Sequence, residues 1–255
     1  MIKDRYPILE YDSSPDAFMN PSDMLAPIDI APHCVLCFFQ EVISGLRERG
    51  LLRVVHMLGS EMGPNPVYEL EMDGRRLALM QPGIGAPLAA GFTDELIALG
   101  CRKFIACGGA GVLDRNLVVG HIVVPDSAVR DEGTSYHYLP PSREVTPSPE
   151  AVAAIEATLQ RHGVPYVVGK TWTTDGFYRE TAARVARRRV EGCLTVEMEA
   201  AAFFAVGRFR GVPIGQLLYS GDDLSGAEWD GRDWRNRPSI RERLFWLAAE
   251  ACLML

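Results

Sequence analysis

The chain has 255 residues, of which 47% are hydrophobic, and this suits one large α/β domain. Its formal net charge of −7 and pI near 5.3 argue against a nucleic-acid-binding surface, because such a surface concentrates Lys and Arg. No apolar run approaches the roughly 18 residues of a membrane-spanning helix, and the N-terminal residues do not resemble a signal peptide. We therefore expect a cytoplasmic protein without nucleic-acid or membrane partners.

The first segment of the chain differs from the rest. Residues 1–32 contain five prolines and few regular patterns, which predicts an extended N-terminal arm that wraps the domain. From residue 33 to 255 the apolar residues follow strand and helix periodicities, so we expect one folded domain over that range.

Predicted strands and helices alternate through this domain. Apolar runs bounded by turn residues predict strands over 34–39, 51–58, 66–72, 75–81, 102–107, 121–129, 166–174 and 214–220. Helical spacing of apolar residues predicts helices over 40–49, 86–99, 148–162, 179–190, 200–210 and 239–253. Asp73 and Gly74 favour a type I′ hairpin turn. This order predicts an α/β fold, a single domain with a mostly parallel or mixed central β-sheet covered by helices on both faces.

Cysteine and histidine patterns indicate neither a redox nor a metal site. The six cysteines lie in apolar contexts and are expected to be reduced core residues, with Cys34 and Cys37 on opposite faces of one strand. The five histidines show no ligand spacing such as HxH or HExxH, so we expect no metal and no cofactor. The basic cluster at 184–190 is interpreted as a solvated helix face.

The stretch from Val196 to Asp222 holds the strongest candidate chemistry. Glu197 and Glu199 flank Met198 at the start of the predicted 200–210 helix, and Asp222 follows the next predicted strand. The two glutamates could simply complement the helix dipole. Carboxylates at strand ends are also common catalytic groups in α/β folds, so both interpretations remain open.

Two further segments follow predicted strands. Gly108, Gly109 and Ala110 belong to a glycine-rich loop that could bring backbone amides close to a ligand or could form a tight structural turn. The loop matches the dinucleotide-binding pattern poorly. Phe177 and Tyr178 could anchor the next helix or stack on a flat ring.

The segment VEMEA at 196–200, followed by Asp222, resembles the signature of the nucleoside phosphorylase and nucleosidase family, which cleaves N-ribosidic bonds. MQPGIGAP at 80–87 and the segment 118–138 also resemble that family, so the likeness covers residues 65–225. The resemblance implies that residues 33–255 are the catalytic domain.

It also implies roles for the candidate residues. Met198 and Glu199, with Glu197 beside them, would hold the ribose, and Asp222 would assist the departing base. Phe177 and Tyr178 would line the base pocket. The backbone amides of 108–111 would bound the side of the nucleophile.

The chain departs from the family pattern at the base and at the phosphate. Thr181 and Ala183 replace the Gln and Arg with which uridine-cleaving members read uracil, so a purine is favoured. Ala106 and Gly109 stand where phosphorolytic members carry an Arg and a hydroxyl, which leaves the phosphate cations to Arg47, Arg53, His56 or a neighbouring subunit.

Glu41 complicates the choice of acceptor, because an acid near this position activates water in hydrolytic relatives. Glu41 could equally be an ordinary helix-start acid. We expect phosphorolysis of a purine nucleoside by a homo-oligomer. The alternatives are a hydrolytic nucleosidase that uses Glu41 as its base and a non-catalytic nucleoside sensor.

Overall fold

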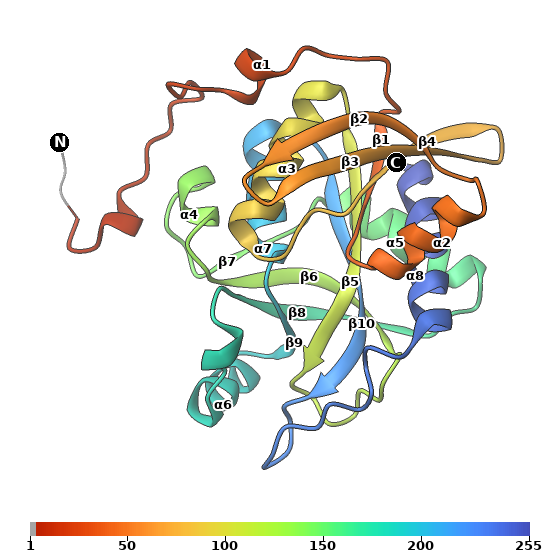
Figure 1. Ribbon diagram of the computed structural model, residues 1–255. Helices are drawn as coiled ribbons and strands as arrows, with labels where there is room; N and C mark the ends of the chain where they lie inside the picture. The colour runs from red at the N-terminus through yellow and green to blue at the C-terminus, as the bar shows by residue number, and fades with distance from the viewer. Residues whose placement is uncertain (1–3) are drawn as a thin grey trace.

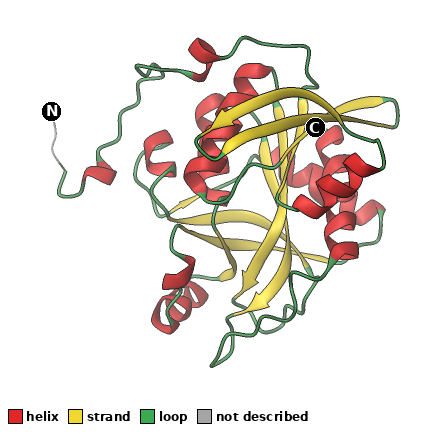
Figure 2. Cartoon of the chain, in the orientation of Figure 1, coloured by secondary structure: helices red, strands yellow, loops and turns green. Residues whose placement is uncertain are grey.

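A ten-stranded mixed sheet forms the centre of the computed structural model, which describes residues 4–255 (Figures 1 and 2). The strands are β1 (His33–Cys37), β2 (Arg53–Ser60), β3 (Gly63–Met72), β4 (Arg75–Met80), β5 (Lys103–Val112), β6 (Ile122–Asp131), β7 (Glu144–Val145), β8 (Tyr166–Thr174), β9 (Cys193–Glu197) and β10 (Ile214–Asp223). The α-helices are α1 (Pro21–Met24), α2 (Gln40–Glu48), α3 (Ala86–Leu99), α4 (Ser135–Tyr138), α5 (Pro149–Arg161), α6 (Ala182–Val190), α7 (Ala200–Arg210) and α8 (Pro238–Met254), and two 3₁₀ turns are η1 (Pro7–Leu9) and η2 (Phe177–Arg179).

The sheet has a closed part and an open part. The strand order is β10-β6-β8-β9-β5-β1-β4-β3-β2, and β10 pairs with β5 as well as with β6. Strands β5, β10, β6, β8 and β9 therefore close into a ring. Closure of this kind leaves the strands without a free sheet edge. Strands β1, β4, β3 and β2 extend outward from β5.

Helices cover both faces of the sheet. On one face α3 and α7 pack through Phe92, Leu96, Phe203 and Phe204. On the other, α2, α5 and α8 pack through Leu46, Ile155, Leu159, Leu244 and Phe245. This confirms the predicted α/β domain with a mixed sheet between two helical layers. Asp73 and Gly74 have φ values of 51° and 72°, as a type I′ turn requires.

Three local predictions were wrong. The glycine segment 108–111 is not a loop but the end of β5, because β10 pairs alongside it with Tyr219 opposite Gly109. Strand β9 was not predicted, since it is short and runs directly into the VEMEA signature. Helix α6 begins at Ala182, three residues later than predicted, because η2 intervenes and the Thr181 side chain caps the helix.

The basic cluster on α6 is also not a wholly solvated face. The Arg188 side chain is buried, pairs with Asp131 at 3.0 Å and with Glu191 at 2.9 Å, and lies over the Trp172 ring. Arg184 pairs with the same Asp131 carboxylate. Helical periodicity could not predict these ion pairs, because their carboxylate partner, Asp131, lies on β6, far away in the sequence.

The N-terminal arm is mostly irregular and runs along one side of the domain (Figure 1). It touches the domain where α1 meets α3 and where η1 meets α4. Several of its large apolar side chains are exposed: Tyr6, Ile8, Phe18, Met19 and Met24. Among the described residues 4–255, no helix combines the length and apolar character needed to span a bilayer.

Candidate active site

A gap in the pairing of the central sheet lies at Gly108–Ala110. On one side of β5, β1 pairs only as far as Cys107, and β9 begins to pair at Gly111. On the other side, β10 pairs with β5 throughout this segment. The backbone of 108–110 therefore has no strand partner along one side, between the end of β1 and the end of β9, although the segment itself is a strand.

Glu199 lies at the edge of this gap, as the N-cap residue of α7. Residues 200–207 of this helix are all apolar or glycine and all buried, so its first turn is buried. The Glu199 side chain is 6% exposed, and its Oε1 accepts a hydrogen bond of 2.7 Å from the backbone N–H of Gly85, just before α3. The packing of α3 against α7 thus fixes the direction of this carboxyl group.

Glu197, at the end of β9, is buried beside it and is bonded within the chain. Its Oε2 accepts hydrogen bonds from the N–H groups of Glu199 at 2.7 Å and Ala200 at 2.6 Å, and its Oε1 accepts one from Thr173 Oγ1 at 2.7 Å. These contacts cap the N-terminus of α7, where an acid complements the helix dipole. Met198, between the two glutamates, is half-buried.

Burial raises the pKa values of both carboxyl groups. The pKa of Glu199 rises to about 8, first because of burial and then because of the charge of Glu197. The pKa of Glu197 rises only to about 6, because hydrogen bonds from Thr173 and from backbone N–H groups oppose the effect of burial. Near neutral pH the pair therefore holds one proton, chiefly on Glu199.

Asp222 lies near the end of β10, close to the same end of β5. Its Oδ2 accepts a hydrogen bond of 2.7 Å from Trp229 Nε1. A side chain at Gly111 would place its Cβ 2.7 Å from Leu224 and 3.6 Å from Asp222 Oδ1, so a glycine there leaves room for this segment. Glu180, at the end of η2, faces Asp222. Burial and then the charge of Asp222 raise the pKa of Glu180 to about 7.

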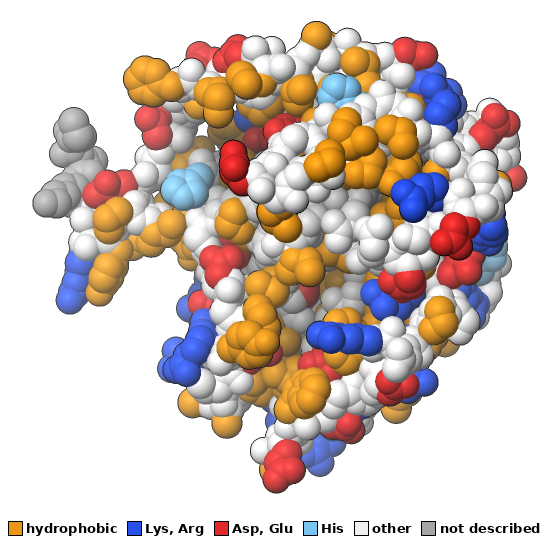
Figure 3. Space-filling model, in the orientation of Figure 1, with side chains coloured by type: hydrophobic (Ala, Val, Ile, Leu, Met, Phe, Trp, Pro, Cys, Tyr) orange, Lys and Arg blue, Asp and Glu red, His pale blue; other side chains and the backbone are white. Residues whose placement is uncertain are grey.

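The aromatic pair lies in the open on η2. The ring centroids of Phe177 and Tyr178 are 4.1 Å apart, and the two side chains are 50% and 88% exposed. Neither ring is therefore an anchor for the following helix. Hydrophobic, acidic and basic side chains lie close together on the face between α6 and the segment that follows β10 (Figure 3).

The remaining predicted residues are divided between this region and other parts of the fold. Glu41, in the first turn of α2, forms an ion pair of 3.0 Å with Arg241 Nε of α8. Arg47 is exposed on α2, and Arg53 pairs with Glu69 at 2.7 Å on the outer strands. The two arginines expected to supply positive charge are thus engaged elsewhere or point into solvent, whereas Arg241 was not predicted.

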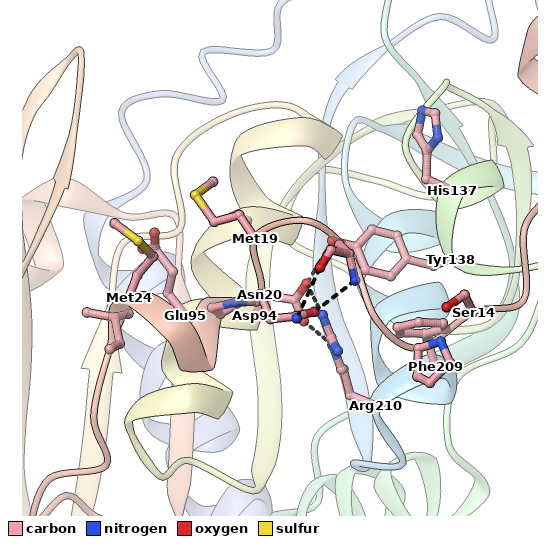
Figure 4. A pocket seen from close by; sticks show the side chains of 15 residues that line it. Ser14, Met19, Asn20, Met24, Asp94, Glu95, His137, Tyr138, Phe209 and Arg210 are labelled. Carbon is pink, nitrogen blue, oxygen red and sulfur yellow. Dashed lines mark hydrogen bonds and ion pairs between the residues drawn. The ribbon is translucent and has the colours of Figure 1, made fainter.

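A separate cavity of about 460 Å³ lies between the N-terminal arm and helices α3, α4 and α7 (Figure 4). Three of its polar groups, those of Asp94, Arg210 and Tyr138, pair with one another. Asp94 Oδ1 accepts from Arg210 Nε at 2.7 Å, and Asp94 Oδ2 accepts from the Tyr138 hydroxyl at 2.8 Å. None of the predicted site residues lines this cavity.

Residues 4–255 contain no group of three or more His, Cys, Asp or Glu side chains that could hold a metal ion. Hydroxyl and backbone N–H groups surround Glu197 and Glu199.

These features define an α/β protein with a buried pair of acids and an unpaired backbone segment at the carboxyl ends of its central strands. A family model described as the phosphorylase superfamily matches residues 32–242, and the chain belongs to this superfamily. The resemblance noted in the VEMEA segment is confirmed.

Individual relatives differ in their activities. The chain is 31% identical over 167 residues to a guanosine phosphorylase of Halorubrum lacusprofundi, and the match covers 66% of this chain and 69% of that protein. It is 31% identical over 153 residues to a uridine phosphorylase of Treponema pallidum, covering 56% of this chain and 59% of that protein.

Two solved structures share the fold over most of their length. An AMP nucleosidase from Bacteroides thetaiotaomicron superposes with a TM-score of 0.72 at 26% identity, covering 89% of this chain and 90% of that chain. A uridine phosphorylase from Vibrio fischeri superposes with a TM-score of 0.73 at 25% identity, covering 88% and 92%. These names include both phosphorylases and a nucleosidase.

Proposed function

We propose that the chain cleaves the N-glycosidic bond of a purine nucleoside and transfers the ribosyl group to phosphate. The observation that carries this proposal is the buried Glu199 carboxyl group, held by Gly85 N–H beside the unpaired backbone of 108–110. A buried acid without a cationic partner is costly to keep, so it is a candidate for function. Sugar hydroxyl groups are suitable donors to it.

The other residues have complementary roles in this proposal. Met198 packs under the sugar, and Glu197 positions Glu199 through the N-terminus of α7. Phe177 and Tyr178 stack on the base, which their exposed rings leave room to do. Asp222, in its protonated form, donates its proton to a ring nitrogen as the C–N bond breaks, so the base leaves as a neutral molecule and Asp222 is left as a carboxylate.

Support for a purine comes from Asp222 and from the residues after the aromatic pair. Thr181 caps α6 through its hydroxyl group and is engaged with the backbone of Arg184. Thr181 therefore does not supply the side-chain amide that a Gln at this position would offer to uracil. The similarity to a guanosine phosphorylase agrees with this choice.

Hydrolysis is the second candidate, because one specific observation favours it. Glu41 lies just beyond the end of β1, which forms one side of the gap at 108–110. A carboxylate there can accept a proton from water. The similarity to the structure of an AMP nucleosidase agrees with that possibility.

We also propose a homo-oligomer, because the arm exposes large apolar side chains that a second copy of the chain would cover. Light scattering coupled to gel filtration would give the assembly size. A monomer in solution would contradict this part of the proposal.

The deciding experiment is a panel of guanosine, inosine, adenosine, AMP and uridine, assayed with and without phosphate. Free base and the form of the released sugar are measured together. We expect purine release that depends on phosphate, with ribose 1-phosphate as the sugar product. Equal release in phosphate-free buffer, with only free ribose formed, would assign the chain to the nucleosidases. If no nucleoside is turned over, the remaining hypothesis is a non-catalytic nucleoside sensor.

A further inference from the structure

Two arginines lie at the start of α8, and one of them, Arg241, reaches the end of β1. Arg241 is in the first turn of the helix, and its guanidinium group lies 4.6 Å from the centre of the Phe39 ring, just beyond the end of β1. Its side chain is 14% exposed. Arg237 is the N-cap residue of the same helix and is half-buried.

Tyr219 connects these arginines to the gap in the sheet. A Cβ atom at Gly109 would lie 3.0 Å from the Tyr219 ring, so this ring packs directly against the 108–110 segment. Its hydroxyl donates to Trp234 O at 2.9 Å, in the segment that leads into α8. Burial raises the pKa of the Tyr219 hydroxyl, and the charges of Arg241, Glu41, Asp222 and Arg237 are near enough to act on it as well.

Two buried guanidinium donors in this cluster, the Nε groups of Arg237 and Arg241, have no hydrogen-bond partner within residues 4–255. Arg237 Nε is buried without a hydrogen bond, while its Nη2 donates to Arg232 O at 2.9 Å. Arg241 Nη1 donates to Arg235 O at 3.1 Å, and its Nε meets Glu41 at ion-pair distance without hydrogen-bond alignment. Buried unpaired donors are costly, and a guanidinium group satisfies them best with a planar or tetrahedral oxyanion.

The charge balance of the cluster also favours an anion. Arg241 pairs with Glu41, whereas Arg237 forms no ion pair with any acid among the described residues. The guanidinium group of Arg237 is therefore left without an ion-pair partner. A phosphate entering a partly dry site needs such a charge, because backbone amides alone do not offset its desolvation.

We propose that Arg237 and Arg241 bind the phosphate nucleophile beside the open backbone of 108–110. This inference rests on the proposed phosphorolysis and replaces the Arg and hydroxyl that the chain lacks at Ala106 and Gly109. Glu41 is then a positioning residue that holds Arg241 over Phe39. The cations come from the C-terminal helix of the same chain, not from the 47–56 segment.

The test uses Arg237→Met and Arg241→Met, which keep an apolar stem of similar length. Arg243→Met is the matched control, because Arg243 lies on the same helix and is exposed. Thermal unfolding is measured in sodium phosphate and in sodium chloride of equal ionic strength. Binding of phosphate to the native state raises the Tm. We expect this rise for the wild type and for Arg243→Met, and its loss in both test variants.

Steady-state kinetics provides the second measurement. Each test variant is expected to raise the KM for phosphate by about 10-fold or more, the scale of one charge-assisted hydrogen bond, with little change in the KM for the nucleoside. Arg241→Lys keeps the charge but loses the two-pronged geometry, so it should recover part of the loss. This partial rescue would not follow from a purely structural role.

The outcomes separate this inference from the proposed function. If the wild type makes ribose 1-phosphate but both Met variants keep a normal KM for phosphate and the phosphate-induced rise in Tm, the arginine site is wrong and phosphorolysis stands. If the wild type releases only ribose but the phosphate-induced rise in Tm still depends on both arginines, phosphorolysis falls and the anion site stands. The absence of a rise in Tm with phosphate in the wild type overturns the site in either case.

Discussion

Glu199→Gln is expected to reduce activity and to increase stability at high pH. The pKa of Glu199 is raised from 4.5 to about 8, so the folded protein holds this proton more tightly than the unfolded chain. The stabilising contribution of the protonated group is complete below about pH 4.5 and is lost as the pH rises toward about 8. At about 1.4 kcal/mol for each tenfold difference in proton affinity, the whole loss is on the order of 5 kcal/mol.

The Gln side chain carries no charge, and its oxygen can still accept the hydrogen bond from Gly85 N–H. We therefore expect the variant to unfold at a higher temperature than the wild type at about pH 8.5, with the difference disappearing near pH 5. The exposed Glu48→Gln is the control and should show no such dependence. Differential scanning calorimetry across this pH range measures the effect.

The same substitution should lower kcat/KM by about 100-fold or more, because a neutral amide binds sugar hydroxyl groups less strongly than a carboxylate. In the wild type, kcat/KM should rise between about pH 6 and 8 as Glu199 ionises, and this limb of the profile should be absent from the variant. Near-normal kcat/KM in a folded Glu199→Gln protein would refute the role of Glu199 in sugar binding.

Three further substitutions test the other side of the site. Asp222→Asn should impair purine nucleosides far more than a riboside with a good leaving group, such as a nitrophenyl riboside, and equal losses would leave Asp222 a structural residue. Gly111→Ala brings a Cβ within 2.7 Å of Leu224 and should cost about 1–3 kcal/mol in urea unfolding, whereas Gly59→Ala, which meets open space, should cost clearly less. Glu41→Gln should keep phosphate-dependent turnover within about tenfold, since Glu41 positions Arg241 in the proposed mechanism. Complete loss of base release in phosphate-free buffer would instead identify it as the base that activates water.

Local patterns predicted most of the fold, because most of its elements are determined by near neighbours. Helix α3 lies over the predicted residues, and the hairpin at Asp73 and Gly74 follows from the φ preferences of its two turn residues. The glycine segment was misjudged because its strand partner β10 lies far along the chain. Pairing between distant segments leaves no periodicity in the sequence.

The residues of the candidate site also differ in whether local sequence could predict them. Glu199 and Asp222 were predicted from a short contiguous signature and from the end of the next strand, both of which are local features. Arg237 and Arg241, which we propose bind phosphate, were not predicted. Nothing in the sequence before α8 indicates that the start of this helix lies near the end of β1. Their spacing of four residues around the helix start was the available signal, but many solvated helices show the same spacing.

Closure of the strand ring also determines when this protein can acquire its site during synthesis. Strand β5 leaves the ribosome well before β10, yet β10 supplies its long parallel partner and carries Tyr219 and Asp222. Until β10 has been made, the side of β5 that pairs with it has no strand partner. Nascent chains with unpaired strands are prone to aggregate. Ribosome-bound chains that stop before residue 214 should therefore depend on chaperones, because the ring that supports the site can close only after β10 has been made.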